Sequence, residues 1–204
     1  MSETFGERAG KLAAAAMALN SAGGVKTPFA LAFLTDPRGP GPMSVAEALP
    51  EGSAIILRHY DDPAREALAR RLAAVAARRG LVLMVGADAG LARKVGAAGV
   101  HLRAGQLSAP PALEGLLVTA ACHSSGELAR AAAIGASLAL LSPAFPTRSH
   151  PGAAALGPER FRALAEASPL PVIALGGVDE TNAAALAGKN VAGLAAISAF
   201  APKA

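Results

Sequence analysis

A histidine directly follows a short apolar run in the stretch VTAACHSS. His123 is the residue here best suited to chemistry, because an imidazole gains and loses a proton near neutral pH and can serve as a general acid or base. The alternative is a rim histidine that only hydrogen-bonds to a loop. No base is evident beside its neighbour Cys122, so we expect that thiol to be a core residue and not a nucleophile.

Two further stretches, PVIALGGV and LAAISAF, have the composition of an anion-binding site. Gly176 and Gly177 lack side chains, so backbone N–H groups can approach an anion closely where the chain turns. Ile197 and Ser198 would begin a short helical turn whose free N–H groups face the same place. A glycine pair alone is more often a plain turn, but the two stretches together predict a phosphate site.

Three other polar residues lie at or near the ends of apolar runs. Arg58 in IILRHY is the best side-chain candidate for binding a ligand carboxylate or phosphate, and an ion pair at the rim is the alternative. Asp36, after LAFLT, is expected to cap or order the loop that follows. His101 in VHL is expected to be an interior polar group that hydrogen-bonds to a neighbour.

Short apolar runs that alternate with alanine-rich stretches of helical periodicity must position these residues. Such runs are typical of strands buried on both faces of a parallel sheet, which predicts an α/β fold. Eight runs favour a (β/α)8 TIM barrel, with chemistry at the carboxyl ends of the strands, although a doubly wound open sheet predicts the same runs. The expected strands are residues 29–35, 54–57, 81–85, 99–102, 116–120, 138–142, 172–175 and 193–197.

Capping residues mark where three of the intervening helices should begin and where two should end. The expected starts are Asp62 with Pro63, Ser124 with Glu127, and Asp179, and the expected ends are Gly80 and Ala187.

The two ends of the chain predict a variation on the barrel. The last run is followed only by SAFAPKA, so the final helix should be short or absent. Residues 3–19 have helical composition, and we predict that this extra N-terminal helix covers the wall that an eighth helix would cover. We expect one domain over residues 1–204, with the helix in 1–24 and the barrel in 28–200. The PRGPGP stretch at 37–42 is expected to form a lid or rim over the mouth.

Composition narrows the functional classes. The 204 residues are 52% hydrophobic with one cysteine, which suits a compact intracellular domain without disulfides. We expect a cytoplasmic protein, since no apolar run is long enough to span a bilayer and the amino terminus lacks a signal peptide pattern. The net charge is +4, but the basic residues are scattered and only 3% of residues are aromatic, which argues against nucleic acid as a partner.

The ordered set of strand ends resembles the thiamine phosphate synthase and TenI family over roughly residues 29–200. The matching stretches are FLTD, LR after the second strand, GAAGVHL, CHSSGEL, SPAFPT, PVIALGGV with Asn182, and VAGLAAISAF. The resemblance implies a barrel, commonly a homodimer, that acts on the phosphorylated thiazole half of thiamine. It also implies that the loop after the sixth strand closes over the ligands, with Thr147 and Ser149 reaching phosphate or thiazole.

Two chemistries occur within this family, and the synthase is the more demanding. It joins a pyrimidine diphosphate to a thiazole phosphate and uses Mg²⁺ to hold the diphosphate. For a synthase, the resemblance implies the residues Gln-Leu-Arg-Glu-Lys after the second strand, Asn-Asp after the third, and an acidic residue after VHL. This chain has ILRHY, then Gly86 and Ala87, and no carboxylate in RAGQLSAPP. Asp88 lies one place late and could supply one Mg²⁺ ligand, but not two.

The TenI-type thiazole tautomerases aromatise a thiazole phosphate tautomer by moving a proton, without diphosphate, metal or other cofactor. Their acid/base candidate after the fifth strand matches His123, although synthases also carry a histidine there. We therefore favour tautomerase chemistry, with a synthase altered at its Mg²⁺ and diphosphate residues as the alternative. A third possibility is a barrel that binds thiazole or thiamine phosphate as a regulatory protein without turning it over.

Overall fold

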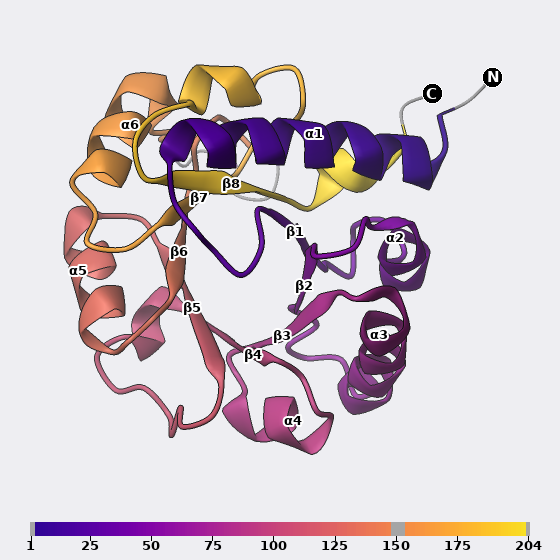
Figure 1. Cartoon of the computed structure of the whole chain (residues 1–204). Helices are drawn as coiled ribbons and strands as arrows, with labels where there is room; N and C mark the ends of the chain where they lie inside the picture. Colours follow the sequence, from indigo (N-terminus) through magenta and orange to yellow (C-terminus); the bar gives the residue numbers. More distant parts are fainter. Residues whose placement is uncertain (1–2, 148–153, 203–204) are drawn as a thin grey trace.

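The computed structural model describes residues 3–147 and 154–202. Within them the strands are all parallel, pair in chain order and close into a barrel through pairing of β8 with β1 (Figure 1). The strands are β1 (Leu31–Leu34), β2 (Ala54–Leu57), β3 (Val82–Gly86), β4 (Gly99–Leu102), β5 (Leu117–Cys122), β6 (Leu138–Leu141), β7 (Val172–Leu175) and β8 (Val191–Ala196). The predicted TIM barrel is confirmed, and the open sheet is excluded.

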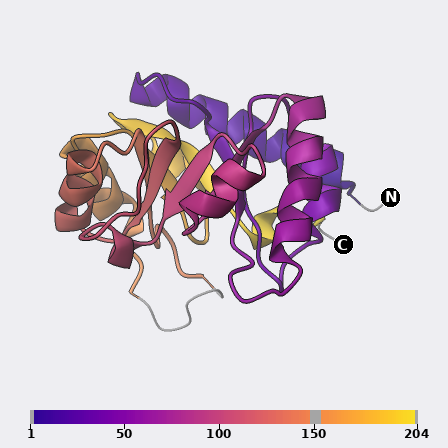
Figure 2. The ribbon, with the colours of Figure 1, turned by 90° about the horizontal axis from the view of Figure 1, so that it is seen from below.

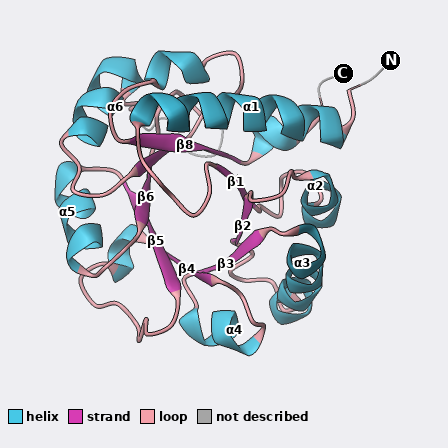
Figure 3. Ribbon diagram, in the orientation of Figure 1, coloured by secondary structure: helices cyan, strands magenta, loops and turns pink. Residues whose placement is uncertain are grey.

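The helices form an outer ring around the strands (Figure 3). They are α1 (Phe5–Gly23), α2 (Pro42–Ala48), α3 (Arg65–Arg79), α4 (Ala89–Lys94), α5 (Ser125–Ala133) and α6 (Gly157–Glu166), with short 3₁₀ turns η1 (Ala104–Gln106), η2 (Ala183–Leu186) and η3 (Ser198–Phe200). Among the helices of the described residues, none has both the length and the apolar character that a membrane span requires.

Side chains alternate along each strand between the barrel interior and the helical layer. In β1, Ala32 and Leu34 pack in the interior against residues such as Ile56 and Ile173. The intervening Leu31 and Phe33 belong to the larger apolar layer between strands and helices. Because both faces of each strand are covered, the runs are apolar throughout, as the sequence indicates.

Two of the predicted helix starts are wrong. The carboxylate of Asp62 accepts a hydrogen bond from the N–H of Ala64 at 2.8 Å, within a turn that precedes α3, so the helix begins only at Arg65. Asp179 accepts from the N–H and hydroxyl of Thr181, and the segment after it forms the short turn η2 and not an α-helix. Ser124 caps α5 as predicted.

The N-terminal helix covers the outside of β8, as predicted (Figure 1). The side-chain amide of Asn20 donates to the carbonyl of Ala192 at 3.0 Å, and the N–H of Asn190 donates to the carbonyl of Gly23 at 3.1 Å. A Cβ atom at Gly23 would lie 2.0 Å from the carbonyl oxygen of Val191, so only glycine permits this approach. The turn after β8, η3, is too short to cover that wall.

Arg8 joins this helix to the loops beyond β7 and β8. Its side chain is 1% exposed, and its guanidinium donates to the carbonyl of Ala199 in η3 and to the carboxylate of Glu180 after β7. A charge in so dry a position is tolerated because it is paired and hydrogen-bonded. Arg8 therefore ties two loops of the barrel mouth to one helix.

Replacing Arg8 by methionine keeps much of the side-chain volume but removes the cation. We expect the free energy of unfolding to fall by about 3 kcal/mol, because a buried ion pair loses one partner. Urea unfolding measures this change. Lys11→Met on the same helix is the matched control, since Lys11 pairs with Glu3 while 57% exposed, and little change is expected there. Equal losses in the two variants would contradict a special role for Arg8.

Candidate functional site

The candidate residues lie at the same end of the barrel, because each follows or ends a parallel strand. Figure 2 shows the segments after the first two strands and the described part of the loop after β6 on one side of the barrel. The structure brings Thr147, Gly176, Gly177, Ile197 and Ser198 into one hollow. It places Arg58 in a second hollow after β1 and β2. Ser149 falls outside the described residues.

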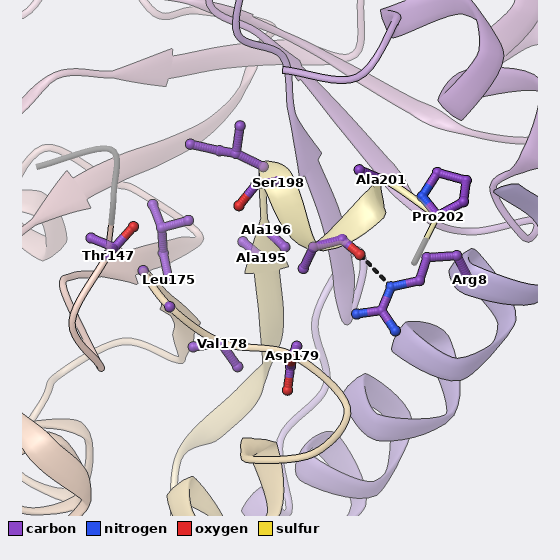
Figure 4. A pocket seen from close by; sticks show the side chains of 14 residues that line it. Arg8, Thr147, Leu175, Val178, Asp179, Ala195, Ala196, Ser198, Ala201 and Pro202 are labelled. Atoms are coloured by element: carbon purple, nitrogen blue, oxygen red, sulfur yellow. Dashed lines mark hydrogen bonds between the residues drawn. The ribbon is translucent and has the colours of Figure 1, made fainter. Parts of the chain in front are cut away.

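The first hollow lies between the ends of β7 and β8 and has a volume of about 350 Å³. Figure 4 shows Thr147 and Leu175 at the left of the view and Arg8 at the right, with Ser198 between them, and the guanidinium of Arg8 donates to the carbonyl of Ala199. Arg8 is the one lining residue from the N-terminal helix. The size suits a small polar group, and residues at the ends of both strands line the hollow.

Two features of the structure require glycine at positions 176 and 177: the backbone conformation and the close approach of the loop after β6. Gly176 and Gly177 have φ values of +94° and +65°, a region that disfavours residues with a side chain. A Cβ atom at Gly176 would lie 2.9 Å from Cα of Pro143, and one at Gly177 would lie 2.5 Å from the carbonyl oxygen of Pro146. The glycines therefore let the loop after β6 lie directly against the end of β7.

Backbone hydrogen bonds hold that loop in place. The N–H of Ala144 donates to Leu175 O, and the N–H of Phe145 donates to Gly176 O, both at 2.9 Å. The run of apolar residues in β6 thus ends at Leu141, and the chain then pairs briefly with the end of β7. This pairing carries Thr147 to the edge of the hollow.

Asn182 braces the other side of the glycine turn. Its side-chain amide donates to the carbonyl of Gly177 at 2.8 Å and accepts from the N–H of Asp179 at 3.0 Å. The amide thus spans the loop after β7, and both of its polar atoms are used in fixing the backbone. Asn182 is a positioning residue for the hollow.

His123 is exposed just beyond β5 and is oriented by its neighbours. Its Nδ1 lies 2.9 Å from the carbonyl oxygen of Ser142, which can only accept, so Nδ1 carries the proton in this contact. In the neutral ring, Nε2 is then the atom that can take up a proton. The carboxylate of Glu127 accepts from the backbone N–H of His123 at 2.5 Å. In the predicted capping box it would accept from the backbone N–H of the N-cap residue, Ser124, which is the next residue.

Cys122 occupies the core position that its sequence context predicts. The thiol is fully buried in the layer beneath α5, and burial raises its pKa to about 12. A thiol with so high a pKa has almost no thiolate near neutral pH, which excludes a role as nucleophile.

Arg58 forms an ion pair at the rim of the barrel, which was the alternative to ligand binding in the interpretation of the sequence. Its guanidinium lies 3.1 Å from the carboxylate of Asp36, which also accepts from the backbone N–H of Arg38 at 2.9 Å. Burial alone would raise the pKa of Asp36, but the hydrogen bonds from Arg38 and the charges of both arginines outweigh it and lower that pKa. Asp36 thus orders the first loop, as expected.

Two buried histidine–threonine pairs lie beneath the mouth. His101 Nδ1 is 2.9 Å from Thr119 Oγ1, which confirms an interior polar group with a neighbouring partner. His59 Nδ1 is 2.9 Å from Thr35 Oγ1, a pair that the sequence did not suggest. Burial lowers the pKa of both rings, and burial together with the charge of Arg58 lowers that of His101 to about 3.

Asp88 is not free to act as a metal ligand. Its Oδ1 accepts from the N–H of Leu91 at 2.8 Å as the N-cap of α4, and its Oδ2 lies 3.5 Å from Nη1 of Arg65. Across the described residues, no three histidine, cysteine or acidic side chains converge in a way that could hold a metal ion. The one carboxylate that the sequence offers near the expected Mg²⁺ position is thus already used as a helix cap and in an ion pair.

Comparison with known families supports the resemblance seen in the sequence. The family model described as thiamine monophosphate synthase matches residues 32–200, which is nearly the whole barrel. The chain belongs to this family.

Named relatives agree with that family assignment. A thiamine-phosphate synthase of Thioalkalivibrio sulfidiphilus is 36% identical over 152 residues, covering 69% of this chain and 71% of the relative. A putative thiamine-phosphate synthase of Geobacter sulfurreducens is 33% identical over 187 residues, covering 86% and 88%. These names favour the synthase alternative over the tautomerase chemistry that we predicted from the sequence.

A solved structure shows the same architecture in the family. Thiamine phosphate pyrophosphorylase from Pyrococcus furiosus superposes with a TM-score of 0.66 at 27% identity, covering 86% of this chain and 87% of that one. The chain is thus a thiamine-biosynthesis family barrel in both sequence and fold.

Several lining residues of the hollow between β7 and β8, Arg8 among them, were not predicted from the sequence. A signal for it exists, since Arg8 lies on the same face of the N-terminal helix as Leu12 and Leu19, both of which are buried. A basic residue within an apolar helix face indicates a buried partner. The identity of that partner, Glu180, depends on the packing of α1 against β8 and the segment after β7 and has no local signal.

The buried histidines predict acid sensitivity. A ring whose pKa falls from 6.5 to about 3 on folding stays neutral in the folded state, so the unfolded state binds more protons between those values. His101 alone should therefore lower the free energy of unfolding by about 2 kcal/mol between pH 7 and pH 5. Urea unfolding at pH 7 and pH 5 measures this loss of free energy. The loss should be smaller in His101→Gln than in the unsubstituted protein, whereas the control His123→Ala, at an exposed position, should show the full loss. An unchanged loss in His101→Gln would contradict this account.

Proposed function

We propose that this barrel binds the phosphate of a thiazole phosphate in the hollow between β7 and β8 and catalyses thiamine phosphate formation. The Gly176–Gly177 turn is the observation that best supports a phosphate site. Its positive φ values and lack of side chains expose backbone at the hollow that it shares with Ile197 and Ser198. The relatives named thiamine-phosphate synthase support the reaction. A cytoplasmic homodimer is part of this proposal.

In that reaction the thiazole nitrogen attacks the methylene carbon of a pyrimidine diphosphate. A carbon–nitrogen bond forms, the carbon–oxygen bond to the diphosphate breaks, and the diphosphate leaves with the electron pair. The protein's own contribution is to hold the thiazole phosphate at a fixed distance from the pyrimidine and to stabilise the departing anion. The loops after β6, β7 and β8 supply the first of these functions.

A thiazole tautomerase is the second candidate, and the geometry of His123 favours it. Because Nδ1 donates to Ser142 O, the neutral ring presents Nε2 as a proton acceptor at the mouth. Proton transfer on a bound thiazole phosphate needs a positioned acid or base and no metal.

Two parallel assays decide between these reactions. Purified protein is given pyrimidine diphosphate with thiazole phosphate, and separately the thiazole carboxylate phosphate tautomer, and products are separated by chromatography. Thiamine phosphate as the product supports the synthase. Aromatised thiazole alone, with a rate lost in His123→Ala, overturns the synthase in favour of the tautomerase. Tight thiazole phosphate binding without either product leaves a binding protein.

The glycine turn gives a prediction that is independent of the reaction. Gly177→Ala places a Cβ against the carbonyl of Pro146 and forces a residue with a side chain to φ +65°. We expect affinity for thiazole phosphate, measured by calorimetry, to fall at least about tenfold because the loop must move. Gly10→Ala is the control, since no atom lies within 4 Å of a Cβ there. Unchanged affinity in Gly177→Ala would place the phosphate elsewhere.

A further inference from the structure

The hollow between β7 and β8 begins where the pairing of these two strands ends. The last paired residues are Leu175 in β7 and Ala195 in β8. Beyond them the chain continues as two separate segments, residues 176–180 and residues 196–202, and members of both segments line the hollow. Strand pairing therefore does not set the distance between these two walls of the hollow.

One side chain is bonded to both walls. The guanidinium of Arg8 donates through Nε to the carbonyl of Ala199 in η3, and through Nη1 to the carboxylate of Glu180, which follows the glycine turn. Figure 4 shows this side chain extending from α1 towards the loops after β7 and β8. Arg8 thus links the wall after β7 to the wall after β8.

The burial of Arg8 indicates that it acts through the walls and not as a ligand contact. Its side chain is 1% exposed, and the carboxylate of Glu180 balances its charge. A guanidinium is planar and rigid, with five N–H donors, so two acceptors bound to it are held in a fixed geometry relative to one another. Lysine and methionine cannot impose such a geometry.

Aromatic packing holds η3 from another direction. The rings of Phe33 and Phe200 meet edge to face with their centroids 5.1 Å apart, and both side chains are buried. Because Phe33 belongs to β1, this contact fixes η3 against the first strand. The bonds of Arg8 are different, since they connect η3 to the loop after β7.

The helix that carries Arg8 is anchored at its other end as well. The side-chain amide of Asn20 donates to the carbonyl of Ala192 at 3.0 Å, and the carbonyl of Gly23 accepts from the N–H of Asn190 at 3.1 Å. These contacts lie near the start of β8, whereas η3 follows its end. They hold α1 on the barrel without reaching the hollow.

We propose that Arg8 is a positioning residue for phosphate binding, which sets the width of the hollow by joining Ala199 to Glu180. At that width, backbone groups of both walls can contact one phosphate. The inference rests on the proposed function, because it takes a thiazole phosphate as the ligand. Arg8 lies outside residues 32–200, which match the family model, so this role makes the N-terminal helix part of the site.

Calorimetric titration of thiazole phosphate into the full chain tests this role. We expect the dissociation constant to rise at least about tenfold in Arg8→Met, because the two walls lose their common link. Arg8→Lys should retain part of the affinity, since it keeps the cation but not the planar fork. Glu180→Gln should give an intermediate loss, because its amide oxygen can still accept from Arg8.

Asn20→Leu is the matched control. It removes a hydrogen bond between α1 and β8 far from the hollow, so it should lower stability but leave the affinity unchanged within about twofold. A purely structural role for Arg8 would likewise lower stability without changing the affinity of the folded protein. Circular dichroism at the titration temperature shows whether each variant is folded, and Arg8→Lys and Glu180→Gln carry the test if Arg8→Met is not.

Two results would overturn the proposal alone. Unchanged affinity in the folded variants of Arg8 and Glu180 would show that the ligand does not depend on this link. Equal losses of affinity in Arg8→Met and Asn20→Leu would show that the general packing of α1 controls the site. Failure of the unsubstituted protein to bind thiazole phosphate is a distinguishable outcome, because it contradicts the proposed function and this inference together.

Discussion

Closure of the barrel by pairing between β8 and β1 is the constraint on which the rest of the mouth depends. Gly193 has a φ of +144°, and a Cβ there would lie 1.9 Å from the carbonyl oxygen of Ala30, so the closing strand passes where only backbone fits. The pairing of β8 with β7 brings the turn after β8 beside the glycine turn after β7, and α1 packs on the outside of β8. The hollow between β7 and β8 and its lining residue Arg8 depend on these contacts, because β8 is held between β7 and β1 and is covered by α1.

The two halves of the mouth depart from the family pattern to different degrees. The side formed by β6, β7 and β8 keeps its glycines and the backbone pairing that holds the loop after β6 against Gly176. The side formed by β2, β3 and β4 has Tyr60 and Gly86 where the resemblance to a synthase implies a lysine and an asparagine, and the guanidinium of Arg103 stacks on the Tyr60 ring. This difference between the two sides accounts for a clear family match over residues 32–200 beside departures from the synthase pattern at the ends of β2, β3 and β4. It also explains why the relatives' names and the local chemistry favour different members of the family.

The sequence predicted the barrel well because each strand is buried on both faces, which leaves short apolar runs that are easily recognised. It also located the glycine turn, because the glycine pair in PVIALGGV and the turn in LAAISAF both follow apolar runs. Helix starts were less predictable, because Asp62 and Asp179 bind backbone within turns and not at helix termini. The ion pair of Arg8 with Glu180 spans 172 residues, and the contact of Tyr60 with Gly86 crosses from one strand end to another, so neither has a local signal.

Amide hydrogen exchange with and without thiazole phosphate tests the central claim that backbone groups after β7 and β8 bind the phosphate. The account predicts that the amides of Ala144 and Phe145 are protected in the free protein, because they already donate to the end of β7. On addition of thiazole phosphate, new protection should appear at Gly177, Ile197 and Ser198 and at no comparable set of amides elsewhere. Protection that appears only after β2 to β4, or none at all at saturating ligand, would contradict it.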